Sequence, residues 1–358
     1  MRPNRDELIN MLTLSDPAEL EALYKRAYEV KREYVGTKVY FRGLIELSNI
    51  CTKNCIYCGI RCGNPNVKRY QISREEVLAE ARWCWEQRYG SLVIQAGERE
   101  DKAWTDFITD LVVDIKNLSQ GELGITLSLG EQTEKVYRQW FEAGAHRYLL
   151  RIEESNPELY KALHPAGHSF QKRLECLRSL RKVGYQTGTG VMIGLPGQTV
   201  EQWDATLREI VGWGAEHFSL YSLILEQSTP LYAQVLGGRV SVPDEDSTAE
   251  MYERAIEQFG VAGYAQYEIS NWAKTENQEP RIENQDPSER AVLDSRFLVP
   301  ARACHHNLAY WLNADYLAAG AATRDETSDR VAFYQAHHRP HRAPHPAETP
   351  GYALEIPL

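Results

Sequence analysis

The sequence lacks the features that mark several large classes of protein. No apolar run approaches the length that spans a membrane, and the first residues contain no apolar signal segment. A positive charge excess is also missing, because the formal net charge is −10 at pH 7, which argues against a nucleic-acid-binding body. We therefore expect neither a membrane nor a nucleic acid among the partners of this chain.

Cysteine is scarce, and its count is odd. The 358 residues include seven cysteines, and without a signal segment this count fits a reducing, cytoplasmic location better than a disulfide framework. Hydrophobic residues make up 43% of the chain, which excludes global disorder. A chain of this length can form one large barrel domain or two ordinary domains.

Three of the cysteines stand close together in the segment 49–62. Cys51, Cys55 and Cys58 have the spacing C-x3-C-x2-C, and a short loop with this spacing can turn three thiolates toward one point. Soft thiolates select iron–sulfur clusters, zinc or Cu(I). Three protein ligands would leave one iron of a [4Fe–4S] cluster open to another molecule. Tyr57, just before the last cysteine, suits packing beside a nucleoside.

A structural zinc site with Cys62 as its fourth ligand is the alternative for this loop. Four-cysteine zinc sites usually consist of two well-separated cysteine pairs, and the spacing here is different. We therefore favour the cluster and interpret Cys62 as a spare thiol.

Beyond the cysteine loop, strand-like and helix-like patterns alternate. The strand-like segments fall at 39–47, 91–95, 124–129, 148–152, 187–193 and 217–225. Helical patterns precede residue 32 and follow after 101, from 131, over 170–182 and from 200. The repeats predict an α/β fold in which a parallel sheet closes partly or completely into a TIM-type (β/α) barrel, with the helices outside.

Polar residues gather after the predicted strands, where barrel enzymes place their active sites. Gly97 would let a ligand approach the backbone, and Glu98 could hold an ammonium group. Arg151 and Glu153 alternate onto one strand face, and Arg173 could grip a carboxylate with two hydrogen bonds. The alternative for the pair of Arg151 and Glu153 is ordinary surface electrostatics, which contributes little stability.

The cysteine spacing, with Tyr57 before the third cysteine, resembles the signature of the radical S-adenosylmethionine (SAM) superfamily. A longer stretch, about residues 23–199, resembles one family within it, the HydE maturases of [FeFe]-hydrogenase. The segments that carry this likeness are 41–51, 95–98, 126–131, 147–157 and 190–199. Biotin synthase and the pyrrolysine enzyme PylB share the scaffold more loosely.

This resemblance implies a [4Fe–4S] cluster and SAM as cofactors, with reductive cleavage of SAM to a 5′-deoxyadenosyl radical. It implies that the cluster ligands, and thus the catalytic residues, are Cys51, Cys55 and Cys58. It implies cofactor contacts for Tyr57, Gln95, Gly97, Glu98, Ser128, Glu153 and Arg173, the last on the SAM carboxylate. It implies a substrate cavity lined by Thr126, Arg151 and Met192.

The C-terminal part resembles a different family. About residues 216–320 are similar to HemW and the oxygen-independent coproporphyrinogen oxidases. In this part, His306 begins an H-N-x-x-Y-W motif, which is associated with haem binding in HemW, so haem is a further candidate cofactor. The alternative, which we favour, is that Tyr310 and Trp311 are core aromatic residues of a helix.

These interpretations divide the chain into six parts. They are an N-terminal helical collar over 1–36, a barrel over 37–225, a HemW-like α+β extension over 226–274, a flexible insertion over 275–303, the motif segment over 304–325 and a disordered tail over 326–358. The insertion and the tail are assigned from their polar, low-complexity composition.

The function expected from the longer resemblance is that of a HydE-like maturase. Its partners would be a small-molecule substrate, an electron donor such as flavodoxin or ferredoxin, and other hydrogenase maturation proteins. One alternative is a HemW-like haem chaperone or coproporphyrinogen oxidase-like protein. Another is a composite scaffold that keeps the cluster without a working substrate site.

Overall fold

The computed structural model describes residues 5–34, 42–165, 167–275 and 316–319. Over these residues, strands form one sheet in the order β7-β8-β6-β5-β4-β3-β2-β1-β9. The strands are β1 (Arg42–Ser48), β2 (Ser91–Ala96), β3 (Gly124–Ser128), β4 (Arg147–Leu149), β5 (Gln186–Ile193), β6 (His217–Ser222), β7 (Tyr264–Glu268), β8 (Asn271–Lys274) and β9 (Tyr316–Ala319). β1 to β6 lie parallel in chain order, which confirms the predicted α/β fold.

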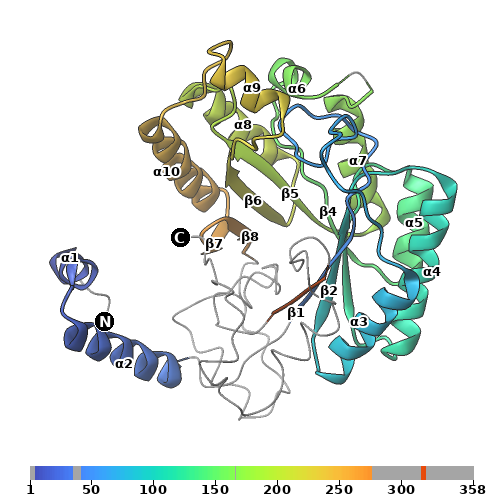
Figure 1. The fold of residues 1–358 in the computed structure, drawn as a ribbon, viewed down its shortest axis with the longest axis horizontal. Helices are drawn as coiled ribbons and strands as arrows, with labels where there is room; N and C mark the ends of the chain where they lie inside the picture. Colours follow the sequence, from blue (N-terminus) through green and yellow to red (C-terminus); the bar gives the residue numbers. More distant parts are fainter. Residues whose placement is uncertain (1–4, 35–41, 166, 276–315, 320–358) are drawn as a thin grey trace.

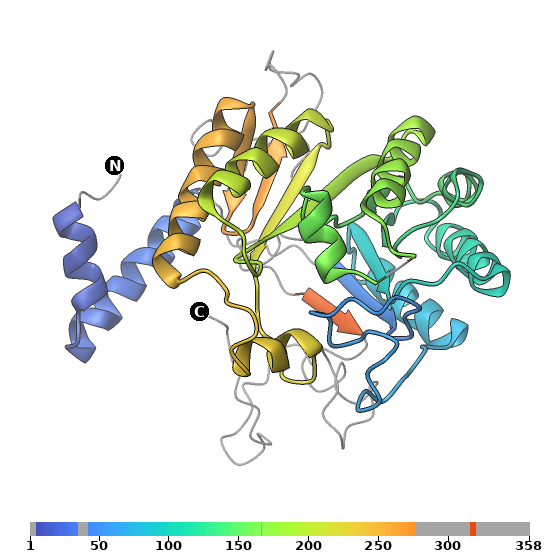
Figure 2. The same ribbon diagram turned by 90° about the horizontal axis from the view of Figure 1, so that it is seen from above.

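The barrel is partial. β9 pairs with β1 at one edge, and β7 forms the other edge; within the described part of the chain these two edges do not pair. Figures 1 and 2 show the sheet curving, with helices on its outer side. The helices are α1 (Arg5–Thr13), α2 (Pro17–Tyr34), α3 (Arg74–Glu86), α4 (Lys102–Leu118), α5 (Glu134–Ala143), α6 (Pro157–Leu163), α7 (Phe170–Val183), α8 (Val200–Gly212), α9 (Pro230–Leu236) and α10 (Glu245–Val261).

Side chains of the central strands alternate between the two faces of the sheet. Leu92 and Ile94 of β2, and Ile125 and Leu127 of β3, are buried in one hydrophobic cluster with side chains of α3, α4 and α5. The strand residues between them are half-buried, Gln95 among them. This period of two directs apolar residues to the helices and leaves polar residues on the inner face of the sheet.

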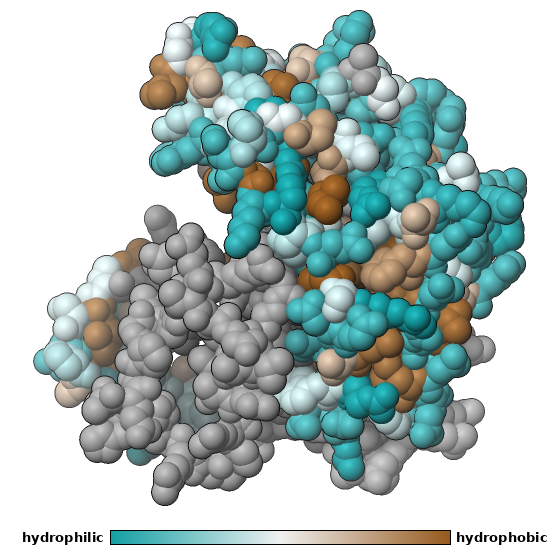
Figure 3. All heavy atoms as spheres, turned by 45° about the vertical axis from the view of Figure 1, so that its right-hand side comes forward, coloured by the Kyte–Doolittle hydropathy of each residue, from teal (hydrophilic) through white to brown (hydrophobic). Residues whose placement is uncertain are grey.

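The outer surface of the helices is mainly polar, as the face in Figure 3 shows. None of the described helices combines the length and the apolar character needed to cross a membrane. The first helix, α1, lies apart from the barrel in both ribbon views (Figures 1 and 2).

The segment after β6 is joined to the barrel through both the sheet and the core. β8 pairs antiparallel with β6 and with β7. Phe218 of β6 stacks on Phe259 of α10, with ring centroids 4.7 Å apart. Trp203 of α8 and Trp272 of β8 belong to the same hydrophobic cluster. Residues 226–274 therefore complete a core that the barrel strands begin.

Some predicted boundaries differ from the structure. The predicted strand 148–152 is short, because β4 ends at Leu149, although the amides of Leu150 and Ile152 still donate to carbonyls of β5 at 3.0 Å. The strand predicted over 217–225 ends at Ser222. The predicted insertion, motif segment and tail lie outside the described residues, apart from Thr275 and β9.

A buried carboxylate holds together the loops that follow β4 and β5. Glu154 is 1% exposed. Its carboxylate accepts hydrogen bonds from Ser155 N at 2.8 Å and Asn156 N at 2.9 Å. It also accepts from Thr206 Oγ1 at 2.6 Å and Gln198 Nε2 at 2.9 Å. One side chain thus connects the start of α6 with α8 and the loop before α8.

Removal of this carboxylate should destabilise the fold. Glu154→Ala leaves buried donors without an acceptor, and we expect a loss of about 3 kcal/mol in the free energy of unfolding. Urea denaturation followed by tryptophan fluorescence measures this loss. Glu209→Ala, on the exposed side of α8, is the matched control and should change the free energy little. Equal effects of the two substitutions would contradict the role given to Glu154.

Candidate metal centre and buried polar network

The cysteine loop begins where β1 ends, at the carboxyl edge of the sheet, as predicted. Gly97 N donates to the carbonyl of the last β1 residue at 2.8 Å, and Thr52 N donates to Glu98 O at 2.9 Å, which ties the loop to the end of β2. Ile56 N donates to Leu163 O at 3.0 Å, which ties it to the end of α6. Main-chain contacts from two separate elements therefore fix the path of the loop.

Gly97 is required by the packing of this loop. A Cβ atom at Gly97 would lie 2.4 Å from Ile50 O and 2.9 Å from Cys51 Cβ, so no larger residue fits while the loop keeps its place. The sequence predicted a glycine that admits a ligand to the backbone. In the structure, the chain segment that approaches Gly97 is the cysteine loop itself.

The three cysteines of the motif differ in exposure from Cys62. Cys55 is buried, Cys51 and Cys58 are half-buried, and Cys62 is exposed. Burial, together with the neighbouring Cys58, raises the pKa of the Cys55 thiol to about 12, although Arg173 opposes the change. Burial also raises the pKa values of Cys51 and Cys58. Three crowded thiols of this kind fit a bound metal centre, whose positive charge would compensate three thiolates.

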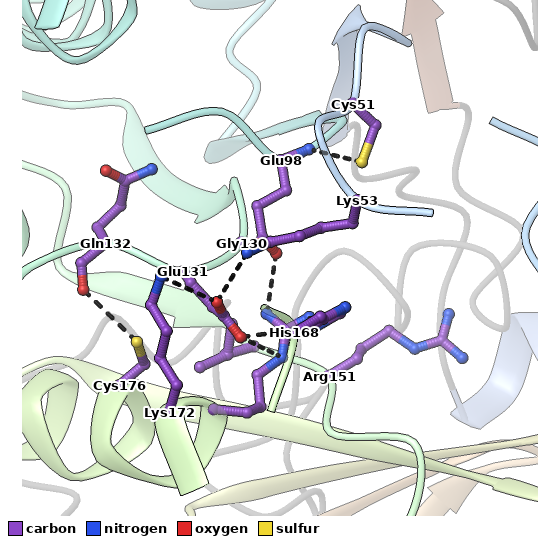
Figure 4. A network of polar contacts seen from close by, with 12 residues as sticks. Cys51, Lys53, Glu98, Gly130, Glu131, Gln132, Arg151, His168, Lys172 and Cys176 are labelled. Carbon is purple, nitrogen blue, oxygen red and sulfur yellow. Dashed lines mark hydrogen bonds and ion pairs between the residues drawn. The ribbon is translucent and has the colours of Figure 1, made fainter. Parts of the chain in front are cut away.

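A buried network of charges lies beside the cysteine loop (Figure 4). Lys53 Nζ, from the loop, lies 3.0 Å from Glu98 Oε1 and 3.0 Å from Glu131 Oε2. Arg173, from the first turn of α7, places its NH1 atom 3.0 Å from Glu98 Oε2 and its Nε atom 3.5 Å from Glu131 Oε1. The two carboxylates follow β2 and β3, so the network joins four elements of the fold.

The network keeps its charges although water is excluded. Burial alone would lower the pKa of Lys53, but Glu98 and Glu131 raise it above the usual lysine value. Burial opposes the charged form of Arg173 in the same way, and Glu98 again raises its pKa above the usual value. Glu98 Oε1, Glu131 Oε1 and Arg173 Nε make no hydrogen bond within the described residues, although each lies within 3.5 Å of an opposite charge. The site thus keeps polar atoms that a ligand can still bind.

Two histidines from the loop between α6 and α7 support the cysteine loop from the other side. His164 Nε2 lies 3.0 Å from the hydroxyl of Tyr57. His168 Nδ1 lies 3.3 Å from Cys55 Sγ, and His168 Nε2 lies 2.8 Å from Arg173 NH2. The second histidine therefore connects the charge network with one of the cysteines.

Arg151 and Glu153 form the predicted ion pair, but the predicted strand geometry is wrong. Arg151 Nε lies 3.1 Å from Glu153 Oε1, and the guanidinium lies over the ring of Tyr221. Both residues come after β4, and Glu153 has a φ of 67°, a strained value for a residue with a Cβ. Glu153 N donates to Gly190 O at 2.9 Å, which helps to hold this conformation.

The other predicted cofactor and substrate residues lie on the inner face of the sheet. Gln95 and Ser128 are paired neighbours on β2 and β3, and Gln95 Nε2 donates to Glu46 Oε1 at 3.0 Å. Thr126 lines a cavity of about 360 Å³ near the amino-terminal ends of β2 to β5. This cavity lies at the amino-terminal edge of the sheet, whereas the cysteine loop lies at the carboxyl edge.

Two predicted residues have other surroundings. Met192 is 7% exposed and packs with Leu163 and Leu195 against Tyr57, so it supports the cysteine loop through an apolar contact. His306, the candidate haem ligand, lies outside the described residues. The functional roles of all these side chains stay predictions.

The sequence analysis did not select Lys53, Glu131, His164 or His168 as site residues. Lys53 lies inside the cysteine motif and Glu131 lies in the loop after β3, so their positions near strand ends were a usable signal. The two histidines stand in a loop more than 100 residues after the cysteines. Only the folded chain brings them beside Tyr57 and Cys55.

Comparison with known proteins matches residues 45–210 to the model of the Radical SAM superfamily. The chain is 45% identical over 197 residues to the [FeFe] hydrogenase maturase subunit HydE of Thermotoga maritima, which covers 55% of each chain. It is 31% identical over 280 residues to radical S-adenosyl methionine domain-containing protein 1 of Danio rerio, covering 74% of this chain and 57% of the relative.

A third relative is the heme chaperone HemW of Bacillus subtilis, 27% identical over 233 residues, or 65% of this chain and 54% of the relative. The chain thus spans little more than half the length of these curated relatives. Among solved structures, methylornithine synthase (PylB) has a TM-score of 0.55 at 19% identity, over 96% of this chain and 95% of that one. This likeness shows that the fold is that of the radical SAM barrel.

The place of Gly97 against the cysteine loop makes it a sensitive position. Gly97→Ala should displace the loop, because overpacking of this kind costs about 1–3 kcal/mol. We expect a lower melting temperature and less iron bound after anaerobic reconstitution. Gly212→Ala is the matched control, since no atom lies within 4 Å of a Cβ placed there. Full iron binding by Gly97→Ala would show that the loop can move without loss of the site.

Proposed function

We propose that this chain, whose residues 45–210 belong to the Radical SAM superfamily, is an enzyme that reductively cleaves SAM in the assembly of an [FeFe]-hydrogenase cofactor. Membership of this superfamily implies a [4Fe–4S] cluster and SAM as cofactors. Cys51, Cys55 and Cys58 would hold the cluster. When bound, the cluster supplies the electron that splits the sulfonium of SAM and releases a 5′-deoxyadenosyl radical.

The observation that carries the proposal is the buried Glu98–Arg173 ion pair beside the cysteine loop. SAM has an ammonium group and a carboxylate on one carbon atom. Glu98 is complementary to the first group and Arg173 to the second. Such a ligand would replace one protein ion pair with two ion pairs to the ligand, so that no buried charge is left unpaired. Glu98 Oε1 and Arg173 Nε are held by ion pairs without a hydrogen bond within the described residues, which supports binding at this place.

Lys53 and Glu131 would keep this site in order while a ligand enters. Glu131 is fully buried and lies within 3.5 Å of Lys53, Lys172 and Arg173. If Arg173 turns toward a carboxylate, Lys53 still lies 3.0 Å from both Glu98 and Glu131. Lys53 therefore keeps both carboxylates paired when Arg173 moves, and Arg173 can change its partner without leaving a buried charge unpaired.

The similarity to HydE supports the choice of pathway. It covers 197 residues at 45% identity. The substrate would be a small molecule. An external one-electron donor protein would complete the reaction.

A HemW-like role is the second candidate, because the similarity to HemW of Bacillus subtilis covers 65% of this chain, compared with 55% for HydE. For this role the protein would bind haem, with His306 as the candidate ligand. A protein that binds haem tightly and cleaves SAM slowly would favour this candidate.

Anaerobic reconstitution with iron and sulfide tests the proposal. We expect four irons per chain, because the three motif thiolates would hold three irons of a [4Fe–4S] cluster and leave the fourth open. We also expect formation of 5′-deoxyadenosine from SAM with dithionite. Alanine substitution of Cys51, Cys55 or Cys58 should abolish both, whereas Cys62→Ala, the matched control, should keep them. Zinc in place of iron, or a cluster-loaded protein that leaves SAM intact, would refute the proposal.

Two further measurements separate the pathways. A cell-free maturation assay that lacks HydE should regain hydrogenase activity when this protein is added. Absorbance titration with haem should show no stoichiometric complex. Tight haem binding that is lost in His306→Ala, together with failure in the maturation assay, would favour the second candidate.

Two arginines should differ in their effect on SAM binding. Arg173→Lys should weaken binding by about 1–3 kcal/mol, because lysine cannot reproduce a bidentate guanidinium–carboxylate contact. Arg151→Lys is the matched control: it should leave SAM affinity nearly unchanged and reduce turnover with substrate. Calorimetric titration of both cluster-loaded variants measures the difference. A loss of affinity in Arg151→Lys alone would reverse the two assignments.

A further inference from the structure

The sulfur of Cys55 differs from the other two motif sulfurs in its hydrogen-bond donors. Cys51 Sγ accepts from the backbone amide of Glu98 at 3.4 Å. Cys58 accepts from the backbone amides of Ile60 and Arg61. Within the described residues, the donor groups around Cys55 Sγ belong to side chains. The side chain at hydrogen-bond distance is His168, whose Nδ1 atom lies 3.3 Å away.

Arg173 fixes the position of the proton on the His168 ring. Its NH2 atom lies 2.8 Å from His168 Nε2, and a guanidinium can only donate hydrogen bonds. Nε2 must therefore accept. A ring whose Nε2 accepts a hydrogen bond cannot be the doubly protonated imidazolium, so it is neutral and carries one proton. This proton lies on Nδ1, the atom 3.3 Å from Cys55 Sγ.

The ring has little freedom to turn away from this arrangement. His168 is 3% exposed. Its ring meets Tyr160 edge to face at a centroid distance of 5.8 Å and His164 at 4.6 Å. A flipped ring would place carbon atoms against both Arg173 and Cys55 and lose both hydrogen bonds. The packing and the two polar contacts thus select the same orientation.

The neighbouring His164 makes its hydrogen bonds elsewhere. Its Nδ1 atom lies 2.7 Å from Tyr160 O, which can only accept, so Nδ1 carries the proton. Its Nε2 atom must then accept from the hydroxyl of Tyr57 at 3.0 Å. This hydrogen bond uses the single hydroxyl proton of Tyr57, which leaves His168 as the donor to Cys55.

We propose that His168 is a positioning residue that donates from Nδ1 to the Cys55 sulfur and thereby raises the reduction potential of the cluster. This inference rests on the proposed function. A hydrogen bond to a ligand sulfur stabilises the negative charge that reduction adds, and such bonds tune iron–sulfur potentials. Reduction adds one electron from an external low-potential donor. No proton is transferred, because His168 is neutral before and after.

The same side chain links two parts of the site that serve different partners. Arg173, which we assign to the SAM carboxylate, holds Nε2 of His168. Cys55, which we assign to the cluster, accepts from Nδ1 of the same ring. Glu98, Arg173, His168 and Cys55 form one continuous chain of contacts, with successive distances of 3.0, 2.8 and 3.3 Å. The electron acceptor and the group that orients SAM are therefore two contacts apart.

Two substitutions of His168 separate its two nitrogen atoms. In His168→Gln the longer amide reaches the place of Nε2 and can accept from Arg173, but it offers no donor to Cys55. In His168→Asn the shorter amide reaches the place of Nδ1 and restores a donor to Cys55. His164→Gln is the matched control, because its amide can still accept from Tyr57. Each variant is studied as the full, cluster-loaded chain.

EPR-monitored redox titration gives the reduction potential of each protein. We expect the equilibrium constant for one-electron reduction to fall about tenfold in His168→Gln, a shift of about 59 mV to more negative potential. His168→Asn and His164→Gln should stay close to the wild type. Pulsed EPR of the reduced protein, with histidine labelled with ¹⁵N, should show a weak nitrogen coupling that is present in His164→Gln and absent in His168→Gln.

Equal potentials in the wild type and His168→Gln, both cluster-loaded and active in SAM cleavage, would overturn this inference alone. A wild-type chain that binds no iron, or that leaves SAM intact, would overturn the proposed function instead. If His168→Gln binds no cluster, the ¹⁵N measurement on the wild type and on His164→Gln decides, and absence of the coupling overturns the inference.

Discussion

The structure around the site depends on the requirement that buried charges be paired. A buried ion whose partner is removed costs about 3–5 kcal/mol. Glu131, fully buried at the end of β3, therefore needs Lys53 from the cysteine loop and Arg173 from α7. Glu98, at the end of β2, needs the same two cations. Because Lys53 and Arg173 are shared by both carboxylates, these ion pairs hold the cysteine loop at the carboxyl edge of the sheet and fix the position of the three thiols.

The same requirement gives the site its chemical character. The network contains both cations and carboxylates, so its net charge is small. Because it is largely buried, the interactions between these charges are stronger than they would be in water. A ligand with a single charge would leave one protein group unpaired, whereas an amino acid group satisfies both signs at once. Arg173 lies between Glu98 and His168. A shift of its guanidinium would therefore change the hydrogen bond to His168, whose ring also contacts Cys55. Under the proposed function, SAM binding and reduction of the cluster would therefore depend on one set of contacts.

Local patterns allowed much of the fold to be predicted, and long-range contacts were out of reach. The alternation of segments predicted six parallel strands in order, and the spacing of Cys51, Cys55 and Cys58 predicted their loop. The strand position of Glu153 was wrong, because its left-handed backbone depends on hydrogen bonds to β5. His168 was missed, because its contact with Cys55 joins residues far apart in the sequence. The spacing of cysteines relates residues that are close in the sequence. The position of the proton on His168 depends on Arg173 and Cys55, and His168 meets Cys55 only in the folded chain.

The two sequence resemblances meet within one sheet. The cysteine loop and the charge network belong to residues 51–173, inside the part matched to the Radical SAM superfamily. Beyond β5, the sheet continues through β6 to β8 and β7, where Ser219 Oγ donates to Asn271 Oδ1 at 2.5 Å and His217 Nε2 lies 2.5 Å from the hydroxyl of Tyr267. The first contact joins β6 to β8 and the second joins β6 to β7, and both lie outside the matched residues. Among the described residues, the ion pairs of the charge network stay within the first part. The cysteine loop also contacts the second part, since Leu231 N donates to Ile56 O at 3.0 Å. A change in the second part therefore leaves the pairing of the buried charges intact but can reach the cysteine loop through this hydrogen bond.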